Sequence, residues 1–120
     1  MRQYEEISTF TRDGFLVIVD KTDEDIALRH CFDDSCYDIE DMERKVNNYE
    51  LDWFMLRVRV MLSGHELGSH YLGGCLYKDA KDVLTDGTVE DCLIEAMHEA
   101  KLEARRLLGS LQKVVDGQTV

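Results

Sequence analysis

The sequence contains no proline, which excludes several kinds of structure at once. Rigid proline-rich linkers, PxxP ligands and native cis-proline turns all require that residue. Long hydrophobic runs are also missing, since no apolar stretch approaches the roughly 18 residues of a membrane-spanning helix. The segment Met1–Glu6 is polar and lacks the apolar centre of a secretory signal. We therefore expect neither membrane insertion nor export.

Positive charge is scarce. The chain has 14 lysines and arginines against 25 aspartates and glutamates, for a net charge of −11. A field of this sign repels phosphate backbones and anionic lipids, so we expect no direct nucleic-acid binding and no membrane partner. It attracts a basic protein surface, although the same acidity also serves solubility alone.

Four cysteines occur, at Cys31, Cys36, Cys75 and Cys92. Without an export signal we expect free thiols in a reducing compartment, which predicts a cytoplasmic protein. The alternative is a zinc site in which His30, Cys31 and Cys36 are joined by Cys75 or Cys92. Because the spacing contains no CxxC pair, we expect no metal ligands and no cofactor.

No catalytic signature is found in the sequence. The glycines do not form a phosphate-binding motif, and the carboxylates lack the loop pattern of an EF-hand. A nucleophilic pair could in principle assemble from Cys31 or Cys75 with His65 or His70, but neither an oxyanion loop nor a nucleophile elbow accompanies them. We therefore expect no catalytic residue and no enzymatic activity.

The chain of 120 residues predicts a single domain over 1–120, and a hydrophobic fraction of 44% is ordinary for a globular protein. A hairpin is expected first, with strands Tyr4–Thr11 and Phe15–Val19. The Asp-Gly pair in its turn favours the positive φ angles of tight hairpins. Because Phe15–Val19 is continuously apolar, we expect a central strand covered on both faces.

The second hairpin is predicted from Leu51–Leu62 and Leu67–Tyr77, where glycines favour a bulge or a close backbone approach. Alternation along the first strand places its apolar set in the core, namely Phe54, Leu56, Val58, Val60 and Leu62. The opposite face carries Trp53, Met55, Arg57, Arg59 and Met61. If exposed, the first four of these would form an aromatic-basic patch that could bind a base or an acidic peptide. They are Trp53, Met55, Arg57 and Arg59. We favour shielding of Trp53 by the loop after Asp20.

Two helices are predicted. The first begins near Ser35 or Asp38, and its apolar residues at helical spacing are expected to face the core, namely Ile39, Met42, Val46 and Tyr49. The second runs from about Val89 to Val115 with an apolar stripe at alternating spacings of four and three. A helix of that length spans roughly 40 Å and is expected to overhang a small sheet.

These elements predict an α+β fold in the order β-β-α-β-β-α. The simplest assembly is a four-stranded antiparallel sheet with both helices on one face. Joining of the two hairpins through Phe15–Val19 follows from the apolar character of that strand.

The acidic charge is concentrated in one segment. Ten acidic and two basic residues lie between Asp20 and Glu43, which gives a net charge of −8 out of −11. Such spaced carboxylates could occupy a basic groove, as DNA-mimicking inhibitors do, or could form a solvated loop. The candidate partner-binding residues are Asp23, Glu24, Asp25, Asp33, Asp34, Asp38 and Asp41.

The last helix offers a second candidate surface. Its apolar seam at Ala104, Leu107, Leu108 and Leu111 either packs on the sheet or meets a second copy of the chain. A structural module that homodimerises through this helix is therefore the alternative function to partner binding.

Three segments of the chain are distinctive, namely Trp53–Val60 (WFMLRVRV), Leu67–Cys75 (LGSHYLGGC) and Cys31–Ser35 (CFDDS). Together they resemble small accessory proteins of tailed bacteriophages, a group without defined catalytic motifs. The resemblance covers most of the chain and implies a context: such proteins often block a host defence enzyme, including CRISPR complexes, by direct binding. It thus implies an inhibitor of a host nucleic-acid-processing complex, acting in the host cytoplasm on a partner with a basic surface.

Overall fold

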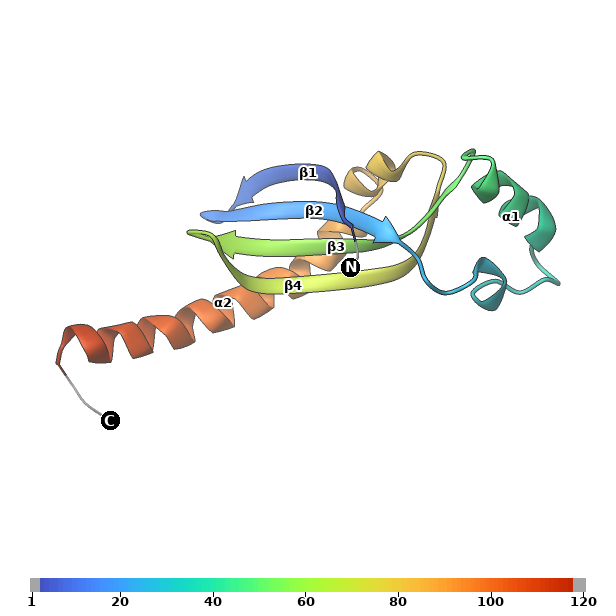
Figure 1. Ribbon diagram of the computed structural model, residues 1–120. Coiled ribbons are helices and arrows are strands. Elements are labelled where there is room, and N and C mark those ends of the chain that lie inside the picture. Colours follow the sequence, from blue (N-terminus) through green and yellow to red (C-terminus); the bar gives the residue numbers. More distant parts are fainter. Residues whose placement is uncertain (1–2, 118–120) are drawn as a thin grey trace.

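The computed structural model describes residues 3–117 and contains one antiparallel sheet with the spatial order β1-β2-β3-β4 (Figure 1). Its strands are β1 (Glu5–Arg12), β2 (Phe15–Asp23), β3 (Asp52–Leu62) and β4 (His65–Tyr77). The helices are η1 (Leu28–His30) and α1 (Ile39–Asn47) between β2 and β3, then η2 (Ala80–Leu84) and α2 (Thr88–Val115) after β4. The predicted α+β fold, with four antiparallel strands and a long C-terminal helix, is confirmed.

Both hairpins close through turns whose two central residues have positive φ. The angles are 53° and 85° at Asp13 and Gly14, and 51° and 80° at Ser63 and Gly64. Turns of this hand match the right-handed twist of the flanking strands. The hairpins join through β2 and β3, where Val17 lies opposite Val60. The sheet is therefore a simple meander, as the sequence predicts.

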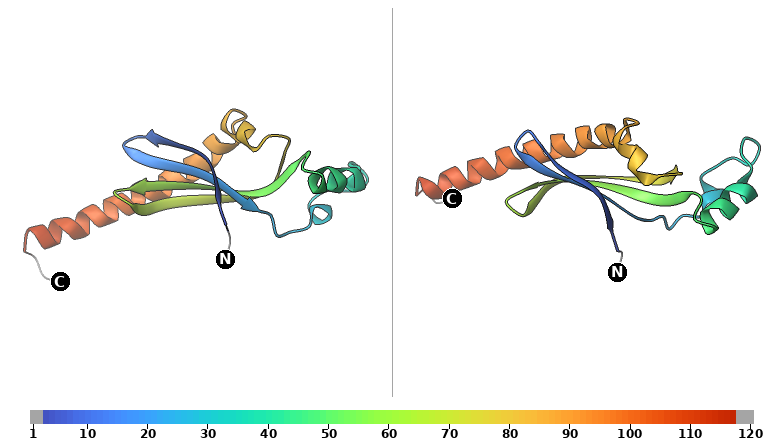
Figure 2. Two further views of the ribbon diagram at one scale, coloured as in Figure 1. Left: turned by 45° about the horizontal axis from the view of Figure 1, so that its top comes forward. Right: turned by 90° about the horizontal axis from the view of Figure 1, so that it is seen from above.

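The hydrophobic core lies between one face of the sheet and α2 (Figure 2). The predicted inward residues Phe54, Leu56, Val58 and Val60 of β3 are almost fully buried. From α2, the buried side chains are Val89, Cys92, Leu93, Ala96, Met97 and Ala100. Alternation along β3 thus identified the core face correctly, apart from Leu62, which is exposed at the end of the strand.

The prediction that β2 is covered on both faces was wrong. Leu16 is 40% exposed and Ile18 is half-buried, whereas Val17 and Val19 are fully buried. Because α2 covers one face alone, the other face of the sheet carries no helix within residues 3–117 (Figure 2). A run of apolar residues cannot by itself distinguish these two situations.

The prediction that both helices lie on one face was also wrong for α1. This helix packs on η1 and lies beyond the end of the sheet, where residues 24–51 form a small projection that we call the lobe (Figure 1). Ile39 is buried within the lobe, but Tyr49 is 96% exposed and follows the end of α1 with φ of 61°. The helix has nine residues, which is too short to reach back across the sheet.

The backbone of α2 approaches β4 closely at Gly68. A Cβ atom built on Gly68 would lie 2.2 Å from the carbonyl oxygen of Ala96 and 2.7 Å from the nitrogen of Ala100. Glycine at this position, opposite two alanines, is what allows the helix to lie so near the strand. The register of β4 also shifts near Gly68 and near Gly73 and Gly74, so the predicted bulges and close approach are confirmed.

The helix α2 extends well past the sheet, as expected from its length (Figure 1). Ala100 is the last fully buried residue of the helix, and beyond it Ala104 and Leu107 are partly buried against the core. The molecule is consequently elongated, with principal extents of 64, 27 and 26 Å. Among the helices of residues 3–117, none has the combination of length and hydropathy that a membrane span requires.

Candidate interaction surfaces

A hollow of about 780 Å³ opens on the lobe, which contains most of the acidic segment. It is lined by Arg29, His30, Phe32, Asp33, Asp34, Tyr37, Asp38, Ile39 and Glu40. Three of the predicted partner-binding residues, Asp33, Asp34 and Asp38, are therefore brought together by the fold. Its aromatic side chains pack edge to face, with 5.1 Å between the ring centroids of Phe32 and Tyr37.

The carboxylates of this hollow are not held in salt bridges among residues 3–117, although Arg29 lies close enough to Glu40, and Arg44 close enough to Asp38, to interact electrostatically. Asp33 accepts the backbone N–H of Ser35 at 2.9 Å, and the hydrogen bonds from Ser35 hold the pKa of Asp33 below its usual range. Asp38 caps α1 by accepting the N–H of Asp41 at 3.1 Å. Within residues 3–117, no salt bridge involves Asp33, Asp34, Asp38 or Glu40. We call these four side chains the acidic cluster.

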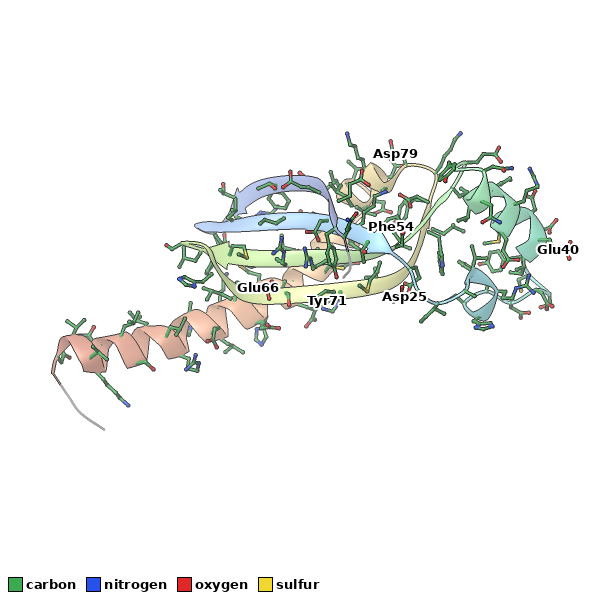
Figure 3. The ribbon with its side chains drawn as sticks, viewed as in Figure 1. Asp25, Glu40, Phe54, Glu66, Tyr71 and Asp79 are labelled. Atoms are coloured by element: carbon green, nitrogen blue, oxygen red, sulfur yellow. The ribbon has the colours of Figure 1, made fainter. Side chains whose placement is uncertain are left out.

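Glu40 belongs to this cluster although the sequence analysis did not select it. It is exposed and lies at the outer end of the lobe (Figure 3). Its position two residues after the N-cap Asp38, in the first turn of α1, was the signal that could have identified it. Negative charge in a first helical turn is favourable, so Glu40 also suits the helix.

Asp41, by contrast, is paired within α1. Its carboxylate bonds Arg44 and forms an ion pair with Lys45 at 3.0 Å. The hydrogen bonds from Arg44 and then Lys45 lower the pKa of Asp41. The prediction placed Asp41 on the binding surface, but its charge is balanced by its own helix.

Glu24 has an internal structural role. Its carboxylate accepts the backbone N–H of Gly74 at 2.7 Å and that of Ile26 at 3.3 Å. It therefore ties the start of the lobe to β4 instead of facing the hollow. Asp23 and Asp25 lie outside the hollow as well, with Asp23 at the end of β2 and Asp25 where the lobe leaves the sheet (Figure 3).

Trp53 fastens the lobe to the sheet. Its indole Nε1–H donates to the carbonyl oxygen of Ile26 at 2.9 Å, and its ring centroid lies 5.9 Å from that of Phe32. The loop after Asp20 thus packs on Trp53, as expected, and leaves this side chain half-buried. This contact also gives the acidic hollow a support in the sheet.

The open face of the sheet carries an ion-pair network. The guanidinium of Arg57 donates to Asp20 through Nε at 2.8 Å and Nη2 at 2.6 Å, and Arg59 lies 3.4 Å from the same carboxylate. Tyr4 covers Arg57, with 3.5 Å between the guanidinium carbon and the ring centroid. The basic part of the predicted aromatic-basic patch is thus half neutralised and largely covered by the chain itself.

The cysteines do not assemble with histidines or carboxylates. Cys75 and Cys92 lie in the core, and burial raises the pKa of the Cys75 thiol to about 11, whereas Cys31 and Cys36 are exposed in the lobe. Between residues 3 and 117, no three His, Cys, Asp or Glu side chains lie together as metal ligands. A thiol held protonated by burial is also poorly suited to be a nucleophile.

The predicted dimer seam on α2 is divided by the sheet edge. Ala104 and Leu107 are partly buried against the core, whereas Leu108 is 65% and Leu111 60% exposed.

No family model, curated protein or solved structure matches the chain. Function must therefore follow from the chemistry of these surfaces.

Proposed function

We propose that this chain is a non-catalytic binding protein that docks a basic partner protein against the acidic hollow of the lobe. The observation that carries the proposal is the acidic cluster: four carboxylates without ion pairs, on one concave surface of a projecting lobe. Such a group of like charges repels itself and is relieved when a cationic surface approaches.

The lining of the hollow favours arginine as the side chain to be bound. Carboxylates accept the guanidinium group in a bidentate manner, and aromatic rings stack on its plane. Phe32 and Tyr37 supply the rings, while Asp33, Asp34 and Asp38 supply the carboxylates. Arg29 and His30 also line the hollow, and the Arg29 guanidinium is paired with Glu43 at 2.6 Å.

The partner class in this proposal is a nucleic-acid-processing enzyme or defence complex of a host cell. Proteins that hold phosphate backbones carry grooves rich in lysine and arginine, and an acidic hollow complements such a groove. The resemblance to phage accessory proteins supports the same context. The chain would then act as an inhibitor that occupies the groove in the cytoplasm of the host.

A capture experiment with charge-matched variants tests the proposal. The first variant neutralises the acidic cluster with near-isosteric amides, through Asp33→Asn, Asp34→Asn, Asp38→Asn and Glu40→Gln. Asparagine is also a good N-cap, so the helix start is retained. The control variant makes the same change in net charge on other exposed carboxylates, through Glu66→Gln, Asp82→Asn, Glu95→Gln and Glu99→Gln.

The wild-type chain and the control variant are expected to retain one stoichiometric basic protein from a bacterial lysate, while the cluster variant loses it. If the partner is a nucleic-acid-binding enzyme, its substrate should compete with the chain for binding. Equal loss from both variants would mean that net charge alone attracts the partner, and the proposal would then be wrong.

A further inference from the structure

An uncharged hollow lies beside the acidic hollow and shares two of its lining residues. Its volume is about 420 Å³, and Phe32 and Tyr37 line both hollows. Its other walls come from Met42 of α1, the stretch 72–77 of β4 and Thr88 at the start of α2. Of the lining residues that the structure describes, none carries a charge at neutral pH. We call this space the apolar hollow.

Several apolar side chains of this hollow remain in contact with water. Leu72 is 38% exposed and Tyr37 is 50% exposed, while Met42 is half-buried. The exposed Gly73 beside Leu72 brings no side chain to the rim, so another chain can approach the strand there. Covering such apolar surface with a side chain of a partner is favourable, because water is released from both surfaces.

The shared ring pair determines which kind of chain can cover the apolar hollow. Phe32 and Tyr37 line both hollows, so a chain that fills the apolar one passes next to the acidic cluster. The carboxylates there attract a basic segment and repel an acidic one. A second copy of this chain, with a net charge of −11, is therefore a poor occupant. An apolar side chain carried by a basic segment is complementary to both hollows at once.

We propose that the basic partner docks through an extended segment with two anchors: an arginine in the acidic hollow and a bulky apolar side chain, two residues away, in the apolar hollow. This inference rests on the proposed function, since it assigns a second anchor to the same partner. We choose an extended segment because β4, which lines the hollow, is an edge strand of the sheet among residues 3–117. Sheet edges bind chains in that conformation.

The spacing of two residues follows from the thickness of the shared wall. Groups in contact with opposite sides of one aromatic ring lie about 7 Å apart, which is twice the usual contact distance between carbon atoms. In an extended chain, side chains at positions i and i+2 point to the same side and lie about 6.6 Å apart. Neighbouring side chains at i and i+1 point to opposite sides and could not enter both hollows.

The wall between the hollows is fixed before a partner binds. The ring centroid of Phe32 lies 5.1 Å from that of Tyr37 and 5.9 Å from that of Trp53. Trp53 is in turn held by its hydrogen bond to the carbonyl oxygen of Ile26. A preformed wall lowers the cost of ordering side chains on binding, so both anchors can contribute to affinity.

Calorimetric titration of the full chain with three synthetic peptides of equal net charge tests the proposal. Each peptide has one central arginine in a glycine- and serine-rich sequence with lysines at both ends. The first has leucines two residues before and two residues after the arginine, the second has serines there, and the third has the leucines directly beside the arginine. We expect the first to bind about tenfold more tightly than the second, as burial of one leucine side chain implies. The third should lose most of this gain.

Two protein variants locate the second anchor. Leu72→Thr shortens the wall of the apolar hollow but keeps a residue suited to a strand, and it should reduce the leucine preference to below about threefold. Leu16→Thr is the matched control, because Leu16 is a strand leucine with 40% exposure that lines neither hollow. It should keep the full preference. Circular dichroism should show that both variants remain folded, and the comparison of peptides on the wild-type chain needs no variant.

The outcomes separate this inference from the proposed function. Equal affinities for the leucine and serine peptides, both lost when the acidic cluster is neutralised, would overturn the second anchor and leave docking at the acidic hollow intact. A leucine preference that survives Leu72→Thr unchanged would also overturn it, because the apolar side chain would then bind elsewhere. Binding of all three peptides that neutralisation of the acidic cluster does not weaken would contradict the proposed function and this inference together.

Discussion

The carboxylate of Glu24 accepts the backbone N–H of Gly74 at 2.7 Å, across 50 residues of sequence. This bond joins the first residue of the lobe to a bulge of β4, and Trp53 adds a second tie through the carbonyl of Ile26. One member of the acidic segment is therefore structural, and it helps to position the carboxylates that are exposed. The lobe is held at its base, which is what a rigid docking surface requires.

Glu24→Ala should loosen the lobe without unfolding the sheet. The substitution leaves the Gly74 N–H without its charged acceptor, and hydrogen bonds to charged groups contribute roughly 1.5–3 kcal/mol. Amide hydrogen exchange should accelerate at Gly74 and across residues 25–50, while β2 and β3 keep their protection. Glu66→Ala, at an exposed site on β4, serves as the control and should change neither region.

Asp20→Asn should be strongly destabilising. Asp20 is 4% exposed and balances Arg57 and Arg59, so its neutralisation leaves two guanidinium groups without a counter-charge. Loss of one partner from a buried pair costs about 3 kcal/mol. Urea denaturation should show this loss as a lower free energy of unfolding.

Asp13→Asn supplies the comparison for that measurement. Asp13 pairs with Lys101 at 3.1 Å, but both side chains are about half exposed. Exposed pairs contribute less than about 1 kcal/mol, and asparagine tolerates the positive φ of position 13. Equal losses in the two variants would show that the open-face network has no special role.

Gly68→Ala should disrupt the packing of α2 on β4. The added methyl group would meet backbone atoms of α2, which cannot move aside as a flexible side chain could. We expect a loss of roughly 3 kcal/mol in the free energy of unfolding, at the upper end of overpacking costs. Gly109→Ala, where an added Cβ meets no atom within 4 Å, should instead stabilise the helix by up to about 1 kcal/mol.

The four thiols should divide into two classes in an alkylation experiment. In the folded protein at pH 8, iodoacetamide should modify Cys31 and Cys36, which are exposed, and spare Cys75 and Cys92. Burial raises the pKa of both core thiols, to about 11 for Cys75, so their thiolate fraction at pH 8 is very small. Mass spectrometry should find two adducts when folded and four after unfolding.

The raised pKa also predicts a dependence of stability on pH. A thiol whose pKa is higher in the folded state contributes fully below the unfolded-state value of about 8.5. That contribution is lost as the pH rises toward 11. The urea midpoint of the wild-type chain should therefore fall over this pH interval. The midpoint of the Cys75→Ala variant should fall less. An identical decline in both proteins would contradict the assignment to Cys75.

Much of the sheet could be predicted from the sequence because its signals are local. The Asp13–Gly14 turn and the alternation from Phe54 to Val60 each depend on neighbouring residues. The position of α1 could not be predicted in this way. Its helical spacing indicates an apolar face but does not identify what that face packs against, and in the fold Ile39 is buried within the lobe instead of on the sheet.

The candidate surface was predicted by region but not by residue. Charge counting located the acidic segment, and three of its seven selected residues line one hollow. It could not distinguish Asp34, which no ion pair neutralises within the described chain, from Asp41, which Arg44 and Lys45 neutralise. Nor could it identify the bond from Glu24 to Gly74, because such a contact depends on the tertiary arrangement.

An NMR titration shows whether the acidic cluster forms the docking surface that we propose. A lysine- and arginine-rich peptide would be titrated into the isotope-labelled chain at about 150 mM ionic strength, where exposed charges are screened beyond roughly 8 Å. We expect saturable chemical-shift changes confined to residues 28–43, and we expect these changes to disappear in the variant with the acidic cluster neutralised. Changes spread equally over the lobe and the exposed glutamates Glu66, Glu95 and Glu99 would contradict it.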